Sequence, residues 1–417
     1  MFVLYEVFLY LVFLLTLPFF LALGVMRGKY LSNFPERMGF YSRKESSHDL
    51  WIHAVSVGET LASRTVVDEI LRQRPGTSIV FTTTTITGQI QARRLFPDAT
   101  VTYFPFDFSF AVRRFLRHHQ PHTFATMETE IWPNVTRIAR SQGIRMILAN
   151  GRISDRSFPR YRAFRGVLRT ILSRYDRILA REPTDHERFV AIGAPESIVE
   201  TSGNVKFDYE PDLSSLEIAG ELEALIAGRR VIVIGSTMEG EDELLLPEIE
   251  RLIASHGLFV VLAPRKPERF ELVAALLAAT SLSSVRRSEL HTDSGPAEVL
   301  LLDSLGELAR IYRYASLAFV GGSLAPFGGH NPIEPAAAGI PVLYGPHMSN
   351  FREIAQKFLQ ADAAFEVRDA DSVTSTIERL LDDEPLRAAM GERARQTVVV
   401  NRGASERTAR RIVELLP

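Results

Sequence analysis

The chain has 417 residues, 46% of them hydrophobic and none of them cysteine; it can bury the cores of two ordinary domains, and it cannot form disulfides, thiolate metal sites or cysteine nucleophiles. The net charge is only −2, but residues 1–205 hold 26 Lys and Arg against 18 Asp and Glu, and the remainder holds 22 against 32. The basic first half favours an anionic partner such as membrane headgroups, nucleic acid or a phosphorylated substrate.

The first 26 residues carry a single charge, Glu6, before Arg27 and Lys29. A secretory signal has cations before its apolar run and small residues at a cleavage site after it, and neither is present. The run is long enough to span a bilayer, which takes about 20 residues, and the cations after it predict that the rest of the chain is cytoplasmic. We therefore expect a membrane anchor over residues 1–26. Because of Glu6 and Pro18, a helix lying in the membrane interface and a buried core helix stay open as alternatives.

Short apolar runs then alternate with helical stretches along the chain. Such alternation predicts parallel sheets with helices on both faces. Residues 206–216 interrupt the alternation and read as a linker between domains at 27–205 and 217–417. The predicted fold is α/β with two Rossmann-like, doubly wound domains facing a cleft, and ligands belong at the carboxyl ends of the strands. The predicted strands are residues 50–55, 78–84, 100–104, 123–127, 145–150 and 177–180, then 230–235, 258–263, 298–303, 317–321 and 341–344.

Two acidic segments of the first half follow predicted strands. Glu59 opens a helix just after a strand, where a buried carboxylate can take a proton from a hydroxyl group. Its spacing from Ser56 also fits a capping box, which is the structural alternative. Glu128 and Glu130 end another strand beside Trp132, and two carboxylates at a buried strand end are costly unless they bind something.

Eight arginines lie between residues 151 and 177, interleaved with Leu, Ile, Phe and Tyr. This pattern predicts a basic amphipathic helical region that suits anionic lipid or a phosphorylated acceptor. A solvated helix face is the alternative.

The second half holds two candidate phosphate-binding segments. Arg265 leaves a strand through a proline-fixed turn, where its guanidinium can bind a phosphate or simply form a surface salt bridge. Farther along, two Gly-Gly pairs in residues 321–329 allow the backbone to approach a ligand. Asn331 is then expected as the N-cap and Pro332 as the first residue of a helix whose amides face a phosphate. Glu334, one turn later, is a candidate for ribose hydroxyls or for capping.

Several motifs are missing from the sequence. There is no Gly-x-x-x-x-Gly-Lys-[Ser/Thr] loop and no Gly-x-Gly-x-x-Gly after the first strand, which disfavours nucleotide triphosphatases and dinucleotide enzymes. Since no Asp-x-Asp and no group of histidines directly follows a predicted strand, we expect no metal and no cofactor. Cationic side chains and a helix terminus would then stabilise a leaving phosphate.

Over nearly its whole length the chain resembles the Kdo (3-deoxy-D-manno-octulosonic acid) transferases of lipopolysaccharide assembly. The resemblance implies a GT-B fold and metal-independent, inverting transfer of Kdo from CMP-Kdo to the tetraacylated, bisphosphorylated lipid A precursor, lipid IVA. It also implies attachment to anionic lipid on the cytoplasmic face of the inner membrane, and no nucleic acid partner. The motifs that carry it are residues 37–40, 53–59, 82–88, 127–134, 203–208, 264–269, 321–324, 328–334 and 345–347.

Position by position, the resemblance implies roles for twelve residues. Glu59 would be the general base, and Glu128 and Lys206 would stabilise the transition state. The residues that would contact CMP are Pro264, Arg265, Leu305, Gly306, Glu307, Asn331, Pro332, Ile333 and Glu334.

The chain also departs from the family pattern. Met238 stands where the family has His, Gly151 replaces the Ala of Asn-Ala-Arg, and residues 304–305 are Ser-Leu in place of Thr-Met. Two other functions stay open: a GT-B transferase or epimerase that uses a UDP-sugar, and a membrane-tethered scaffold without activity. The number of Kdo residues transferred also stays open.

Overall fold

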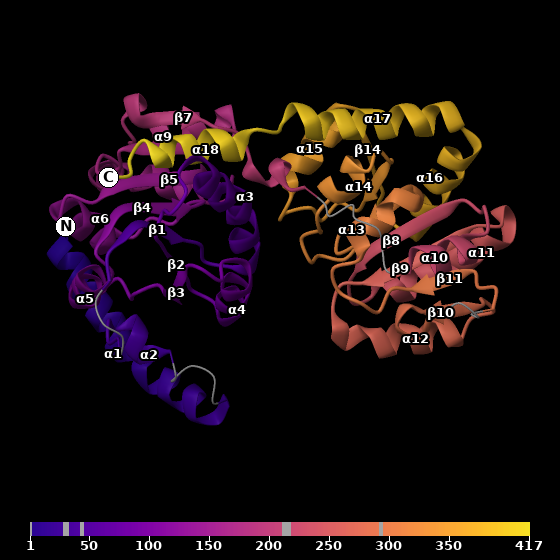
Figure 1. Ribbon diagram of the computed structural model, residues 1–417, viewed down its shortest axis with the longest axis horizontal. Helices are drawn as coiled ribbons and strands as arrows, with labels where there is room; N and C mark the ends of the chain where they lie inside the picture. Colours follow the sequence, from indigo (N-terminus) through magenta and orange to yellow (C-terminus); the bar gives the residue numbers. More distant parts are fainter. Residues whose placement is uncertain (1, 28–32, 42–45, 211–217, 292–294) are drawn as a thin grey trace. The chain divides into compact units, whose positions relative to one another are not determined.

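The computed structural model describes residues 2–27, 33–41, 46–210, 218–291 and 295–417, with side chains described only as far as Pro18 in the first range. The chain divides into two compact units (Figure 1). Unit 1 holds residues 1–209 and 401–417, and unit 2 holds residues 210–400. The expected linker lies partly outside the described residues, and its beginning belongs to a short 3-10 helix of unit 1, η2 (Val205–Asp208).

Unit 1 is built on one parallel seven-stranded sheet with the strand order β3-β2-β1-β4-β5-β6-β7. Its strands are β1 (His48–His53), β2 (Ile79–Thr83), β3 (Thr100–Tyr103), β4 (Pro121–Met127), β5 (Arg145–Gly151), β6 (Arg177–Ala180) and β7 (Val199–Thr201). Its helices are α1 (Phe2–Arg27), α2 (Phe34–Arg37), α3 (Val57–Gln73), α4 (Ile86–Leu95), α5 (Ser109–His119), α6 (Pro133–Ser141), α7 (Phe158–Ala163), α8 (Arg165–Leu172), α9 (Pro183–Ala191) and α18 (Ala404–Val413).

Unit 2 repeats this architecture with the strand order β10-β11-β9-β8-β12-β13-β14, again all parallel. Its strands are β8 (Val231–Thr237), β9 (Phe259–Pro264), β10 (Ser284–Arg286), β11 (Val299–Leu301), β12 (Ala315–Val320), β13 (Val342–Tyr344) and β14 (Ala364–Glu366). Its helices are α10 (Ala219–Ile226), α11 (Glu241–His256), α12 (Phe270–Ala278), α13 (Leu308–Ile311), α14 (Ile333–Ala337), α15 (Arg352–Gln360), α16 (Ala370–Asp382) and α17 (Glu384–Val400).

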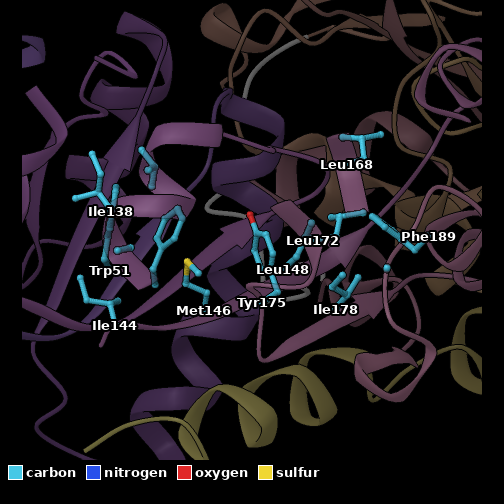
Figure 2. Packing of buried hydrophobic residues seen from close by; sticks show 14 of the residues in the cluster. Trp51, Ile138, Ile144, Met146, Leu148, Leu168, Leu172, Tyr175, Ile178 and Phe189 are labelled. Carbon is cyan, nitrogen blue, oxygen red and sulfur yellow. The ribbon is translucent and has the colours of Figure 1, made fainter. Parts of the chain in front are cut away.

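The central strands are apolar on both faces because helices cover both faces of each sheet. Each unit accordingly has two separate hydrophobic cores, one for each face of its sheet. Figure 2 shows one core of unit 1, where Trp51 of β1 and Met146 of β5 lie among side chains from neighbouring helices. All eleven predicted strands are present. The three strands that were not predicted, β7, β10 and β14, have three residues each and lie at sheet edges, where no long apolar run is needed.

The last residues of the chain return to unit 1, whereas the expected boundary placed them in the second domain. Helix α18 buries Ala404, Ala409 and Ile412 in a core of unit 1. The Asp208 carboxylate accepts hydrogen bonds from the amides of Gly403 (2.5 Å) and Ser405, which fixes the start of this helix. Apolar residues on one face of a terminal helix predict burial, but they do not say in which domain.

Helix α1 covers the expected anchor and is attached to unit 1 by its few polar side chains. The Glu6 carboxylate accepts hydrogen bonds from the Ser109 amide (3.0 Å) and the Asn134 side chain (2.6 Å), and the Tyr5 hydroxyl donates to Asp107 (2.9 Å). Among the helices formed by described residues, none meets both the length and the apolarity needed to traverse a bilayer. The membrane anchor therefore stays a prediction.

Candidate active site

Glu59 lies in the first turn of α3, directly after strand β1. The Ser56 hydroxyl caps this helix by accepting a hydrogen bond from the Glu59 amide. The Glu59 carboxylate in turn accepts hydrogen bonds from the Val55 amide (2.7 Å) and the Ser56 hydroxyl (3.1 Å). The capping role is thus present, and it holds the half-buried carboxylate in one position.

The environment of Glu59 suits a general base. Burial, and then the negative charge of Glu128, raise the pKa of Glu59 to about 7, although the Val55 amide, the Ser56 hydroxyl and Lys206 act to lower it. A carboxyl group with this pKa is about half ionised at neutral pH, and its carboxylate is more basic than an ordinary one. It can therefore take a proton from a nearby hydroxyl group.

Glu128 follows strand β4 in a left-handed backbone conformation, with φ +56°. This conformation is unfavourable for a residue with a side chain and persists where the surroundings hold it. Here Arg181 forms an ion pair and hydrogen bond with the carboxylate, and the Lys206 ammonium lies 3.9 Å from it. Burial acts to raise the pKa of Glu128, but Arg181, Lys206 and Arg152 outweigh it, so the pKa is lowered. Glu128 therefore stays ionised among three cations.

Glu130 is a further carboxyl group at the same strand end. Burial, followed by the charges of Glu59 and Glu128, raises the pKa of Glu130 to about 7. Glu59 and Glu130 therefore titrate in the same pH range and influence each other. Because like charges oppose each other's ionisation, the two groups resist carrying full charge together at neutral pH.

The sheet topology explains why these residues meet. Strands β1, β4, β5 and β6 are neighbours, and their carboxyl ends lie at one edge of the sheet. Glu59, Glu128, Arg152 and Arg181 follow these four strands in that order, and Lys206 lies in η2. The three catalytic residues expected from the sequence are thus together in unit 1. Arg181 is absent from that expectation, although its position directly after a predicted strand is the same signal that applies to Glu128.

In unit 2, several of the expected CMP contacts lie near one another. Arg265 follows Pro264 at the end of β9 and has an exposed side chain. Burial acts to raise the pKa of Glu334, while a hydrogen bond from the Asn331 side chain (3.2 Å) and the charge of Arg265 act to lower it; the pKa ends above its ordinary value. Arg265 is therefore close enough to Glu334 to affect its ionisation. The group offers a cation, an amide and a half-buried carboxyl to one ligand.

The helix after these residues starts later than expected and is short. Its N-cap is Pro332 and its first residue is Ile333, one position later than predicted. It has only five residues, because Gly339 follows with a positive φ of +77°. The Asn331 side chain accepts a hydrogen bond from the Ile333 amide (3.1 Å), so Asn331 folds a local turn before the helix begins.

The first Gly-Gly pair also differs from the expectation. Its loop is filled by Glu241 of α11, whose side chain is fully buried. The Glu241 carboxylate accepts hydrogen bonds from the amides of Gly322 (2.6 Å), Ser323 (2.9 Å) and Leu324 (2.9 Å), and from the Met238 amide (2.9 Å). These amides therefore bind a carboxylate of the protein itself, and the approach of a ligand to this loop stays a prediction. The second pair, Gly328 and Gly329, has positive φ angles of +93° and +73°.

Met238 and His330 both lie close to Gly322. A Cβ atom at Gly322 would lie 2.8 Å from the His330 ring and 3.4 Å from the Met238 side chain. Within the described part of the chain, Nε2 of His330 is buried without a hydrogen-bond partner. Burial, and then the charges of Arg265 and Lys266, lower the pKa of His330 to about 4. The imidazole is therefore neutral at physiological pH.

The remaining expected contact, residues 305–307, forms a turn tied by Glu307. The Glu307 carboxylate pairs with the Arg287 guanidinium at 3.0 Å and accepts a hydrogen bond from the Ser304 hydroxyl. Gly306 has a φ of +90°, and Leu305 is 63% exposed. Since the Glu307 carboxylate is already paired, this turn offers a ligand its backbone and the Leu305 side chain.

Comparison with known proteins adds sequence evidence. A family model described as 3-deoxy-D-manno-octulosonic-acid transferase matches residues 32–209, and one described as glycosyl transferases group 1 matches residues 294–397. A 3-deoxy-D-manno-octulosonic acid transferase from Haemophilus influenzae is 35% identical over 94% of this chain and 93% of its own length. One from Bordetella pertussis is 38% identical over 86% of this chain and 85% of its own length.

Among solved structures, the UDP-GlcNAc 2-epimerase from Neisseria meningitidis bound to UDP-GlcNAc superposes with a TM-score of 0.58, covering 89% of this chain and 99% of its own. Its sequence identity is 13%, so the likeness concerns the fold alone. The predicted architecture of two Rossmann-like α/β domains, of the GT-B type, is thereby confirmed.

Proposed function

This chain belongs to the 3-deoxy-D-manno-octulosonic acid (Kdo) transferase family and is a glycosyltransferase, and we propose that it moves Kdo from CMP-Kdo to lipid IVA, the tetraacylated lipid A precursor. The observation that carries the proposed mechanism is the raised pKa of Glu59, about 7, in a carboxyl group held at a strand end beside Glu128. The transfer needs a base that is ionised at neutral pH and still basic enough to activate a sugar hydroxyl.

In the proposed reaction, Glu59 takes the proton of an acceptor hydroxyl while its oxygen attacks the anomeric carbon of Kdo. The bond from that carbon to the phosphate oxygen breaks, CMP leaves with the electron pair, and the anomeric configuration inverts. Lys206 and Arg181, held around the ionised Glu128, offer positive charge to the anionic groups that meet there. No metal or cofactor takes part.

CMP would be bound by unit 2. Arg265 would pair with the phosphate, and Glu334 would accept hydrogen bonds from ribose hydroxyls. Pro264, residues 305–307 and residues 331–333 would line the nucleotide mainly with their backbone. Met238 has no hydrogen-bonding ring, so the neutral His330, which also lies close to Gly322, would supply an imidazole.

The acceptor is a lipid, and two surfaces of unit 1 support membrane attachment. The face of α1 opposite its polar contacts leaves large apolar side chains in solvent, including Leu4 (74% exposed), Phe8 (59%) and Leu15 (80%). Helices α7 and α8 expose Phe164 (65%) among the arginines at positions 160, 162, 165 and 169. An apolar face and a basic face on the same unit suit the anionic cytoplasmic leaflet of the inner membrane, with α1 lying in the interface.

The direct test is incubation of the purified full chain with a CMP-Kdo-generating system and lipid IVA, followed by mass spectrometry of the lipid. We expect products heavier by whole Kdo residues, and their number shows how many are added. Calorimetry with CMP and UDP provides the comparison between donors. If the chain forms no Kdo product and binds UDP tightly but not CMP, the proposal is wrong and the protein is a UDP-sugar enzyme.

Replacing Glu130 with Gln is expected to move the acid side of the pH–rate profile to lower pH. Removing one carboxylate lowers the pKa of Glu59, because its remaining neighbours are less negative. The base is then ionised at lower pH, and kcat/KM on the acid side rises relative to its plateau. The measurement is kcat/KM against pH for both enzymes. An unchanged profile would mean that Glu130 does not influence the base.

A further inference from the structure

Helix α4 presents two large apolar side chains to solvent in unit 1. Ile86 is 36% exposed and Ile90 is 65% exposed, and they are four residues apart, so they share one helix face. Leu61, on the adjacent helix α3, is 44% exposed. Farther along the same face of α4, Arg93 and Arg94 are exposed as well. The face is therefore apolar near its start and basic at its end.

The start of α4 is fixed against the turn that carries the base. The amides of Thr84 and Thr85 both donate hydrogen bonds to the Val55 carbonyl, at 3.2 Å. A Cβ atom at Gly88 would lie 3.5 Å from the Ser56 backbone and 2.8 Å from the Thr85 hydroxyl, so only glycine fits this approach without a shift. Ile86 therefore directly follows two residues, Thr84 and Thr85, that are hydrogen-bonded to the segment leading to Glu59.

The start of α4 is also connected to α1 through α2. The Arg37 guanidinium of α2 donates to the Thr84 carbonyl and lies over the Tyr103 ring, 4.6 Å from its centre. Phe34 of α2 stacks on Phe13 of α1, with ring centres 6.1 Å apart. A line of packed residues therefore connects the apolar helix α1 with the start of α4.

We propose that Leu61, Ile86 and Ile90 form a ledge that binds an acyl chain of the lipid acceptor while its sugar hydroxyl reaches Glu59. This inference rests on the proposed function and specifies how that acceptor is recognised. An apolar surface beside a catalytic carboxylate suits a substrate that is both sugar and lipid, and Arg93 and Arg94 complement the phosphates of the same molecule. The ledge distinguishes the acylated acceptor from the bare disaccharide.

The test compares the double variant Ile86→Ser/Ile90→Ser with wild type on two acceptors: tetraacylated disaccharide bisphosphate and the same disaccharide bisphosphate without acyl chains. Losing the apolar contact of two isoleucines is expected to raise KM for the acylated acceptor about tenfold. The kcat/KM for the deacylated acceptor should not change. The matched control is Leu244→Ser/Leu272→Ser in unit 2, where both side chains are also exposed (56% and 47%); it should leave both acceptors unaffected.

Equal losses with both acceptors would overturn the ledge, since they would indicate a distorted catalytic turn. Unchanged kinetics on both, or weaker vesicle binding with an unchanged KM, would overturn it too. If wild type transfers Kdo to neither acceptor, the proposed function fails, and direct binding of the tetraacylated disaccharide then decides the ledge separately. Weaker binding in the double variant supports the ledge, and equal binding overturns it.

Discussion

Replacing Glu59 with Gln is expected to lower kcat for Kdo transfer by about 10²–10⁴-fold, the usual contribution of a general base. Glutamine has nearly the same shape and still accepts a hydrogen bond from the Val55 amide, so the helix start should be kept. It cannot take a proton. CMP affinity should stay close to that of wild type, because the residues proposed to bind CMP belong to unit 2. The measurements are single-turnover transfer and calorimetric titration with CMP.

The control for the Glu59 variant is Ser56→Ala. Losing this cap should cost about 1 kcal/mol of stability, while the base remains. It also removes the hydroxyl that donates to Glu59, which raises the pKa of the carboxyl and leaves transfer at high pH close to wild type. If Ser56→Ala and Glu59→Gln lost the same activity at high pH, Glu59 would act only through helix capping.

Replacing Glu241 with Ala is expected to destabilise unit 2 by several kcal/mol. The substitution leaves five amides without their acceptor, those of Met238, Gly322, Ser323, Leu324 and Ala325, and each such buried group costs about 1–3 kcal/mol. That loss is comparable to the whole stability of an ordinary domain. The measurement is denaturant unfolding of both proteins, with loss of CMP binding as the signal that unit 2 has unfolded.

Glu243→Ala is the matched control, since Glu243 lies on the same helix with its side chain 41% exposed and holds one backbone amide, that of Gly240. Its cost should stay near 1 kcal/mol. A Glu241 variant no less stable than the Glu243 variant would mean that the loop binds its carboxylate weakly, and the amides would be available to a ligand.

Much of unit 1 could be predicted from the sequence, because its candidate catalytic residues lie at the ends of strands. Apolar runs locate the strands, and parallel strands bring their carboxyl ends to one edge, so Glu59 and Glu128 were expected to be functional. The arrangement of Arg181 around Glu128 depends on strand order, which a single sequence does not state. Strand β6 lies two places from β4, and only the folded sheet brings the two residues together.

Unit 2 was harder to predict from the sequence. A Gly-Gly loop has the same sequence pattern whether it binds a phosphate or a carboxylate of the protein, and Glu241 stands 81 residues before the amide of Gly322. The late start of α14 has a local origin, since Asn331 folds a turn with the Ile333 amide instead of capping the helix. A long-range contact thus decides the first feature, and a local hydrogen bond decides the second.

The measurement that tests the central claim most directly is kcat/KM for Kdo transfer as a function of pH, at saturating CMP-Kdo. Activity requires the ionised form of Glu59, whose pKa is raised, so the rate should fall as the pH drops through about 7 and reach a plateau above it. In Glu59→Gln this acid limb should vanish along with most of the activity. If the acid limb of the wild-type profile lay near pH 4.5, the ordinary pKa of a glutamate, Glu59 would not be the base with a raised pKa. An acid limb that persists in Glu59→Gln would contradict the same claim.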